Sequence, residues 1–313
     1  MPIRIERYQP GLAAEWAQVL RDAKNGIFLF ERAFMEYHGD RFRDASLVAF
    51  EDDRPVALLP AAWTSEDAVS SHPGLTFGGL VLDLRLRSAQ AFHILEAMLG
   101  AWRDAGARRC TIKALPGLFA TYPAAEMEYA LWRAGFALVR RDLASVLPLQ
   151  DGLPFNAAKL AGARKARKAG MAVAPIAAPD FHAVLASVLQ ERHGAEPVHS
   201  SDELALLEAR FPGRILCRGA IADGRIVAGA LVFVYRHVWH TQYLASSREG
   251  RDNGGLDLVV EALVEEARAR GATHLSLGAS TLDGGRSIND GLLWQKESFG
   301  ARALVHDFYE GTL

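Results

Sequence analysis

One stretch of this chain occurs twice. The segment Ile94–Ala114 (ILEAMLGAWRDAGARRCTIKA) aligns without gaps with Val259–Ala279 (VVEALVEEARARGATHLSLGA). In each copy, apolar residues at helical spacing end at a glycine, Gly106 or Gly271, which suits a left-handed helix cap, and a short alternating strand follows. A repeat of this length predicts two copies of one domain rather than a solenoid.

The elements around the repeat extend it over most of each half. Val48–Ala57 and Ala220–Ala228 both indicate a hairpin upstream of the repeated helix. Each copy then runs hairpin, strand, helix, strand, helix, strand, which predicts an α/β (α+β) fold with a mixed sheet flanked by helices. The turn-rich segment Pro148–Pro154 separates the copies, so we expect domains at 1–150 and 151–313.

Composition excludes several classes of protein. The chain has 313 residues, of which 50% are hydrophobic and 23% charged, and its net charge of −2 gives no reason to expect DNA binding. Cys110 and Cys217 lie in apolar runs, which favours buried thiols over a disulfide or a metal site. The sequence has neither an apolar run of about 18 residues nor the apolar core of a signal peptide, so we expect a cytoplasmic protein without a membrane partner. Monomer and homodimer are both open.

A glycine-containing segment, Arg251–Leu256, follows the strand-like run Trp239–Ala245 and opens the helix of the second copy. A glycine loop at a helix N-terminus offers unpaired backbone N–H groups and the positive end of the helix dipole to an anion. At the matching place the first copy has Leu86–Ala91, which contains no glycine. The contrast predicts one anion site, in the second copy; an ordinary loop before a helix is the alternative.

The order of elements and this loop resemble the GNAT acyltransferases, and in particular the tandem-GNAT, FemAB-like branch. The GNAT loop reads Gln/Arg-x-x-Gly-x-Gly/Ala; Arg251 and Gly254 match it, whereas Leu256 replaces the last small residue. Near the end of the chain, Lys296–Gly300 (KESFG) is similar to the Fem-type K-x-x-F-G. Further segments resemble a bacterial tandem-GNAT group: Ser71–Leu80, Arg192–Ser200, His240–Ser246 and His306–Glu310.

The resemblance implies two tandem GNAT-like domains, each a mixed, mostly antiparallel sheet flanked by helices, with the first a degenerate copy. It implies that the second domain binds acetyl-CoA, or another acyl-CoA, and acylates an amine of a small metabolite, amino sugar or cell-envelope precursor. The candidate CoA contacts are Tyr243, Arg251, Asn253, Gly254, Gly255 and Asn289. For Asn289, a role in capping a helix or loop is an equally good account.

Lys296 is the first candidate catalytic residue. A typical GNAT enzyme has a tyrosine four residues before the glycine of its last helix, and the same count back from Gly300 gives Lys296. A lysine there could stabilise an oxyanion or a leaving group. The alternative is a surface lysine on a helix. The first copy has Leu131 at this register, which again indicates an inert copy.

His240 is the second candidate, because histidine is a suitable general base near neutral pH. It lies on the strand before the glycine segment. Strand alternation places His240 and Gln242 on one face and Thr241 and Tyr243 on the other. A hydrogen-bonded core histidine is the alternative.

The candidate acceptor contacts come from four segments. The loop between the helical stretches 181–190 and 201–210 corresponds to the acceptor-site wall of GNAT enzymes, and Ser200 or Ser201 could cap the second helix. Segment 71–79 ends in two adjacent glycines, Gly78 and Gly79, in a β context, which indicates a bulge or a close approach. Ordinary loop and surface roles are the alternatives throughout. The candidates are His72, Arg192, His193, His199, Gln242 and Arg286, the last as a partner for phosphate or carboxylate.

Two other functions compete with acyl-CoA-dependent transfer. Segment 164–168 has four cations in five positions, and Fem-type transferases that use aminoacyl-tRNA need a basic surface. The near-neutral net charge and the lack of interleaved aromatic residues make a tRNA partner the weaker interpretation. A binding module that has lost its chemistry is the other competitor. The sequence leaves the identity of the acceptor and the acyl length open.

Overall fold

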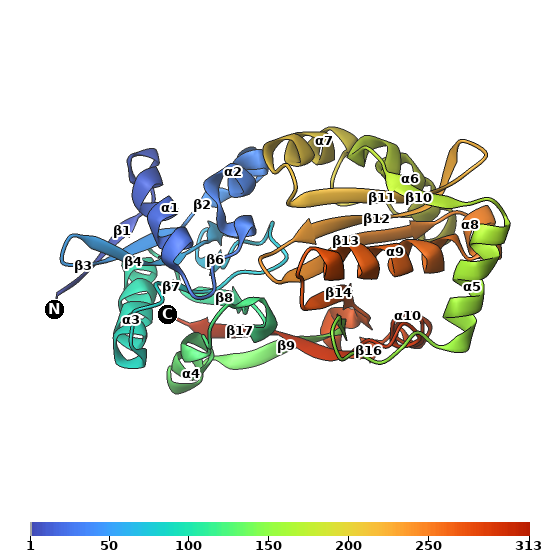
Figure 1. Ribbon diagram of the computed structural model, residues 1–313. Helices are drawn as coiled ribbons and strands as arrows, with labels where there is room; N and C mark the ends of the chain where they lie inside the picture. Colours follow the sequence, from blue (N-terminus) through green and yellow to red (C-terminus); the bar gives the residue numbers. More distant parts are fainter. Residues whose placement is uncertain (1) are drawn as a thin grey trace. The chain divides into compact units, whose positions relative to one another are not determined.

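The computed structural model describes residues 2–313, with Gly39, Asp40 and His193 described by their backbone alone. These residues form two compact units (Figure 1). Unit 1 comprises Met1–Asp142, Gly284–Arg286 and Val305–Leu313. Unit 2 comprises Leu143–Asp283 and Ser287–Leu304.

Unit 1 contains two sheets. One has the strand order β1-β3-β4-β7 and is antiparallel, and in the other β6 and β8 are parallel neighbours. Its helices are α1 (Ala13–Asp22), α2 (Arg32–Met35), α3 (Ser88–Asp104) and α4 (Glu126–Arg133). Its strands are β1 (Ile3–Arg7), β2 (Arg43–Asp44), β3 (Leu47–Glu51), β4 (Arg54–Leu59), β5 (Ala62–Trp63), β6 (Ala68–Ser70), β7 (Val81–Leu82), β8 (Arg109–Lys113) and the first half of β9 (Ala137–Pro148).

Unit 2 is built on one mixed sheet whose pairs are antiparallel except β13 with β14. Its helices are α5 (Ala157–Lys168), α6 (Ala178–His193), α7 (Ser201–Arg210), α8 (Arg248–Asn253), α9 (Gly255–Ala269) and α10 (Asp290–Glu297). Its strands are β10 (Ala172–Pro175), β11 (Ile215–Ala222), β12 (Arg225–Val234), β13 (Val238–Ser246), β14 (His274–Ala279), the short pair β15 (Thr281–Leu282) and β16 (Ser287–Ile288), and the start of β17 (Arg302–Thr312). The predicted fold class, a mixed and mostly antiparallel α/β sheet with helices on it, is confirmed.

The repeat has the same structure in both units. In the alignment, Asp104 at the end of α3 corresponds to Ala269 at the end of α9. Gly106 and Gly271 follow with φ of 100° and 77°, the left-handed conformation that glycine adopts without a steric penalty. Next, β8 and β14 begin at corresponding residues and each pairs with a parallel strand, β6 or β13.

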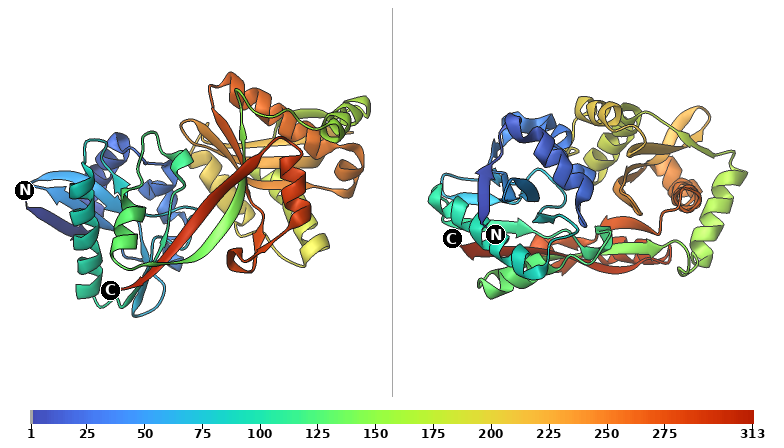
Figure 2. Two further views of the ribbon diagram at one scale, coloured as in Figure 1. Left: turned by 90° about the horizontal axis from the view of Figure 1, so that it is seen from below. Right: turned by 60° about the vertical axis from the view of Figure 1, so that its left-hand side comes forward.

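Each unit is completed by a strand from the other half of the sequence. In unit 2, residues 144–148 of β9 pair with β14, and in unit 1, residues 308–312 of β17 pair with β8 (Figure 2). The last strand of each sequence half therefore belongs to the compact unit of the other half. A simple boundary at residue 150 does not describe this exchange. The sequence copies 1–150 and 151–313 remain our proposed domains.

Each unit also has its own hydrophobic core. In unit 1, α3 buries Ile94, Met98 and Trp102, spaced by four residues as in an amphipathic helix. In unit 2, α9 packs on the face of the sheet to which β12 contributes Ala228, Ala230 and Val232. The opposite face is covered by α6, because Gly229 leaves room for the ring of Phe181. Both cysteines are buried free thiols, as expected.

Candidate functional site

The central strands of unit 2 separate at a defined point. The parallel pairing of β13 with β14 ends at His240 and Ser276, although β13 continues to Ser246 and β14 to Ala279. A left-handed glycine, Gly278 with φ of 72°, bends the end of β14 beyond this point. Backbone N–H and C=O groups on the diverging strands can therefore bind an extended ligand as a strand would.

The side chain of Lys296 lies at this divergence. It is only 4% exposed, on α10, and its Nζ donates to the carbonyl oxygens of Gly278 and Ala279 at 2.8 and 2.6 Å. Burial lowers its pKa from 10.5 to about 8. The alternative interpretation of Lys296 as a solvated surface lysine is wrong, because its amino group is buried against the end of β14. Asn289 caps the same helix through its Oδ1, which accepts from Leu292 N at 3.0 Å.

His240 is buried and its Nδ1 lies 3.0 Å from the Oγ of Ser276, the residue that pairs with it on β14. Sequence reasoning missed Ser276. The sequence did contain a signal for it: Ser276 is a polar residue inside an apolar strand, and it aligns with the polar Thr111 in the other copy. The Ser276 contact orients the imidazole. A Cβ added to Gly278 would lie 3.8 Å from His240 Cε1, and the carbonyl oxygen of the same glycine accepts from Lys296.

The predicted alternation along β13 is wrong after His240. The register of β12 against β13 shifts by one residue, so that Val232 pairs with Thr241 but Leu231 pairs with Tyr243. Gln242 is the extra residue of this β-bulge, and it is half-buried. The bulge moves Tyr243 onto the face of His240, whereas alternation had placed the two on opposite faces.

Tyr243 meets a residue of the loop between α6 and α7 on that face. Its hydroxyl lies 2.6 Å from Nδ1 of His199, and burial is the largest cause that raises the pKa of Tyr243. His199 is buried, and the neighbouring Ser200 caps α7 through a capping box with Glu203, as expected for one of two serines. Arg192 is exposed, and the side chain of His193 lies outside the described part of the structure.

The glycine segment is a junction between two helices, and the expected loop is wrong. Gly254, with φ of 77°, is the single residue between α8 and α9. A Cβ added to it would lie 2.2 Å from the carbonyl oxygen of Gly162 on α5, and one added to Gly162 would meet Asp257. Close packing of α5 across the first turn of α9 thus accounts for Gly254.

The polar residues of this segment form local bonds. Arg251 donates to the carbonyl oxygen of Ser246 at 2.8 Å and pairs with Glu191, and Asn253 donates to the carbonyl oxygen of Glu249 at 3.1 Å. Cations of α5 lie beside them. Lys159 pairs with Asp257 at 2.9 Å, Lys165 donates to the carbonyl oxygen of Asp252 at 2.5 Å, and Arg167 pairs with Glu261.

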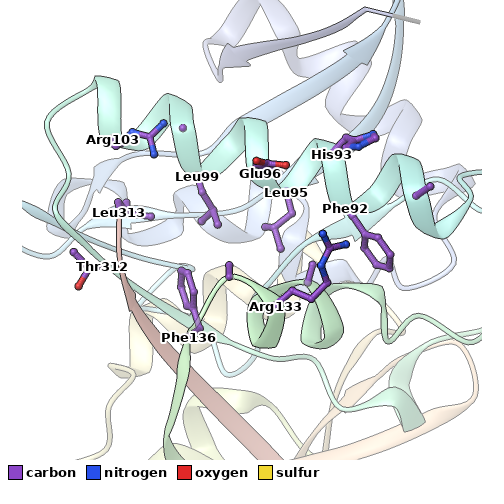
Figure 3. A pocket seen from close by; sticks show the side chains of 14 residues that line it. Phe92, His93, Leu95, Glu96, Leu99, Arg103, Arg133, Phe136, Thr312 and Leu313 are labelled. Atoms are coloured by element: carbon purple, nitrogen blue, oxygen red, sulfur yellow. The ribbon is translucent and has the colours of Figure 1, made fainter.

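Two acceptor candidates belong to unit 1 and are not part of the cluster around Lys296. His72 is buried, its φ of 44° is left-handed, and burial is the main reason that its pKa falls to about 3. Arg286 is exposed on the hairpin between β15 and β16. A cavity of about 490 Å³ between α3 and α4 is lined by neither of them, nor by another predicted site residue (Figure 3). Leu95 and Leu99 on α3 and Phe136 are among its apolar lining residues.

No group of histidine, cysteine and acidic side chains within residues 2–313 could hold a metal ion. Over the same described range, every helix is too short or too polar to cross a membrane.

Comparison with known proteins agrees with this architecture. Residues 158–284 match the family model of the acetyltransferase (GNAT) domain. FemX is similar over the whole chain, with 13% identity, a TM-score of 0.71, and coverage of 99% of this chain and 97% of FemX. The C-terminal domain of a putative lysylphosphatidylglycerol synthetase from Agrobacterium fabrum has 13% identity and a TM-score of 0.62, with 95% and 91% of the two chains covered.

A tandem GNAT protein from the clavulanic acid biosynthesis pathway has 12% identity and a TM-score of 0.53, with 99% and 98% covered. No curated protein matches the chain in sequence. Likeness at such low identity establishes the fold alone. Residues 158–284 therefore match the acetyltransferase (GNAT) domain, and the chain as a whole has the fold of FemX and of the tandem GNAT protein.

Proposed function

We propose that unit 2 is an N-acyltransferase that takes an acyl group from acyl-CoA, acetyl-CoA in the first instance, and transfers it to the amine of a small molecule. One observation carries the proposal: a buried lysine amino group lies where the two central strands of a GNAT domain diverge. Acyl transfer places negative charge on the carbonyl oxygen of the donor, and a cation fixed in a site with little water stabilises that charge.

The environment of Lys296 suits this role. Two of its three N–H bonds are directed at Gly278 and Ala279, which leaves one for the donor carbonyl. With a pKa of about 8 it is mostly protonated at neutral pH, and it is also acidic enough to give a proton to a leaving thiolate, whose conjugate acid has a similar pKa of about 8.5. Lysine would thus act as a cation during attack and as an acid during departure.

We propose His240 as the general base that removes a proton from the amine. Its contact with Ser276 orients the ring beside the same strand divergence. His199 meets Tyr243 on the face of His240, which supports the assignment of His199, with Gln242 at the bulge, to the acceptor side; Tyr243 stays a proposed CoA contact. His72, Arg192, His193 and Arg286 remain acceptor candidates by resemblance alone.

The two parts of acyl-CoA, its pantetheine arm and its pyrophosphate, fit the structure unequally well. The diverging backbone of β13 and β14 suits the pantetheine arm, beside Tyr243. The place expected for the pyrophosphate does not fit as well, because α5 covers the first turn of α9 at Gly254. Arg251, Asn253, Gly255 and Asn289 therefore stay proposed contacts that also have local structural roles.

That covered turn favours a second candidate, an aminoacyl-tRNA donor. Beside the α8–α9 junction, α5 presents Lys165 and the exposed Arg164 and Lys168, which can contact a phosphate backbone. The fold similarity to FemX points the same way. Stabilisation of the oxyanion by Lys296 would serve either donor, because both present an activated carbonyl, but the leaving group that takes a proton is a thiolate from acyl-CoA and a ribose hydroxyl from aminoacyl-tRNA.

The two donors are separated by one experiment. Purified protein is incubated with radiolabelled acetyl-CoA and, in parallel, with radiolabelled aminoacyl-tRNA, each with a panel of a polyamine, an amino sugar and an amino acid. Transfer of label from acetyl-CoA that is lost in Lys296→Met supports the main proposal. Transfer from the aminoacyl-tRNA alone would replace acyl-CoA as donor. Absence of binding and of transfer with both donors would refute the acyltransferase.

A further inference from the structure

Unit 1, expected to be an inert copy, contains the same divergence of strands. The parallel pairing of β6 with β8 ends at Ser70 and Thr111. In the alignment of the repeats, Thr111 corresponds to Ser276, where β13 and β14 separate in unit 2. The two units therefore open at the same register, although the first lacks the glycine segment and has Leu131 in the place of Lys296.

A half-buried lysine nevertheless lies at the opening of unit 1. The Nζ of Lys113, the last residue of β8, donates to the carbonyl oxygens of Leu75, Pro73 and His72 at 2.8, 3.0 and 3.4 Å. Lys113 aligns with Gly278, whose carbonyl oxygen holds Lys296. Each unit thus has an amino group at the end of its second diverging strand, supplied by β8 itself in unit 1 and by α10 in unit 2.

The charge of Lys113 is balanced only by peptide dipoles. Its three acceptors are carbonyl oxygens, and no carboxylate among the described side chains forms an ion pair with it. The 3.4 Å bond to His72 is weak, so one N–H is available to a better acceptor. A cation buried without a counter-ion is costly, and an anion bound beside it would remove much of that cost.

Two buried imidazoles beside this cation each have a nitrogen without a partner. Nδ1 of His72 and Nε2 of His306 make no hydrogen bond in the described structure. His306 shares a face of β17 with Phe308, which pairs with Lys113, and the nearby charge of Lys113 contributes to lowering the pKa of both histidines. Burial, the larger cause, brings these pKa values to about 3 and about 4, so both rings are neutral at neutral pH.

The backbone of His72 supports a role beyond packing. A φ of 44° is uncommon for a residue other than glycine and costs energy. The strained turn His72–Leu75 supplies the carbonyl groups that surround the Lys113 amino group. The acidic neighbours of His306 are already paired, Asp142 with Arg140 at 2.7 Å and Asp307 with Arg141 at 2.6 Å, so they leave the positive charge of Lys113 in place.

We propose that Lys113, His72 and His306 form an oxyanion-binding site in unit 1, for the phosphate or carboxylate of a small molecule. The lysine supplies the charge, and each neutral imidazole supplies an N–H or accepts a proton of the anion through its unpartnered nitrogen. The anion comes from a free ion or from a phosphorylated metabolite. The site is independent of the proposed acyl transfer and is tested without a donor.

The test is a calorimetric titration of the full chain at neutral pH with inorganic phosphate and, separately, with phosphoethanolamine; ethanolamine is the control without an oxyanion. We expect both phosphates to bind, and Lys113→Met to weaken that binding at least about tenfold, the usual consequence of losing a charge-assisted bond. Lys296→Met removes the corresponding buried lysine of unit 2 and should leave the binding unchanged. The tighter of the two probes identifies the source of the anion.

The ring nitrogens give a second measurement. In ¹⁵N spectra, phosphate should shift the signals of His72 and His306, and histidines outside the cluster should not follow. If Lys113→Met does not fold by circular dichroism, His306→Phe, which keeps the ring volume, takes its place with the same expected loss. Equal binding by the wild type and these variants, or no binding of either phosphate by the wild type, overturns the proposal.

Discussion

The amino group of Lys296 donates to the carbonyl oxygen of Ala279 across 2.6 Å and so joins α10 to the end of β14. A second bond, to Gly278, completes the attachment. Both acceptors are uncharged, so the positive charge is held in place without being neutralised. A fixed, incompletely compensated cation is what a site needs in order to stabilise negative charge that appears only during a reaction.

Lys296→Met should therefore lower kcat by about 10²- to 10³-fold, the usual loss when a group that stabilises an oxyanion is removed. The KM for the donor should change little, because the interaction is made mainly in the transition state. Steady-state kinetics with the donor that is active in the transfer assay measures both constants. Glu297→Gln, at the exposed next position of α10, is the control for general damage to the helix. An unchanged kcat would make Lys296 a structural residue.

The pH dependence follows from the pKa of about 8 for Lys296. The protonated amine is the active form, so kcat should fall about tenfold per pH unit above this pH, while any fall on the acid side would come from protonation of the proposed base, His240. Rates measured from about pH 6 to about pH 10 would show the descending limb. In Lys296→Arg, whatever activity remains should lack this limb, because guanidinium stays protonated over the range. A rate that rises through pH 8 would instead identify the neutral amine as a base.

The same group should make stability depend on pH. In the folded protein the pKa of Lys296 is about 8, against 10.5 for an ordinary lysine. Between these values the unfolded chain binds a proton that the folded chain has released, so the free energy of unfolding should rise with pH. Relative to Lys296→Met, wild type should gain roughly 3 kcal/mol across this window and nothing below it.

Urea unfolding of the two proteins at successive pH values measures that difference. The substitution Lys168→Met, on the exposed side of α5, controls for the loss of a lysine as such. A constant difference between wild type and Lys296→Met from pH 8 upward would mean that burial does not perturb this lysine.

The local parts of the fold were predictable from the sequence. The ungapped alignment placed the ends of α3 and α9, the glycines after them and the starts of β8 and β14 at corresponding residues. Those features depend on periodicity and capping within about twenty residues. The count that singled out Lys296 rested on the family resemblance, and the structure places that residue at the strand divergence.

The features that sequence missed depend on distant contacts. The bulge at Gln242 arises from the pairing of β13 with β12, and alternation within β13 alone cannot reveal it. The hydrogen bonds that hold the half-buried Lys113 come from a turn some forty positions earlier in the chain, and no pattern around β8 indicates them. The exchange of β9 and β17 between the units joins residues far apart in sequence, so composition near residue 150 could not indicate it.

The glycine segment shows how one signal serves two structures. A left-handed glycine before a helix fits an open anion loop and a tight helix crossing equally well, and the choice rests on α5. We expect Gly254→Ala to cost at least about 3 kcal/mol, because it adds a clash with the backbone of Gly162 to the strain of a positive φ. Gly271→Ala is the matched control, since Gly271 has the same φ of 77° and open space around it.

The control separates the effect of packing from that of the backbone conformation. Gly271→Ala should lower the free energy of unfolding by only about 1 kcal/mol, because it introduces the strain of a positive φ without a clash. Urea unfolding of both variants against wild type measures the two values. Gly254→Ala is expected to disturb the packing of α5 on α9, so a loss of donor binding in this variant would reflect that packing as well as any pyrophosphate contact. Equal costs at the two glycines would mean that α5 does not press on Gly254, and would restore this segment as an open anion loop.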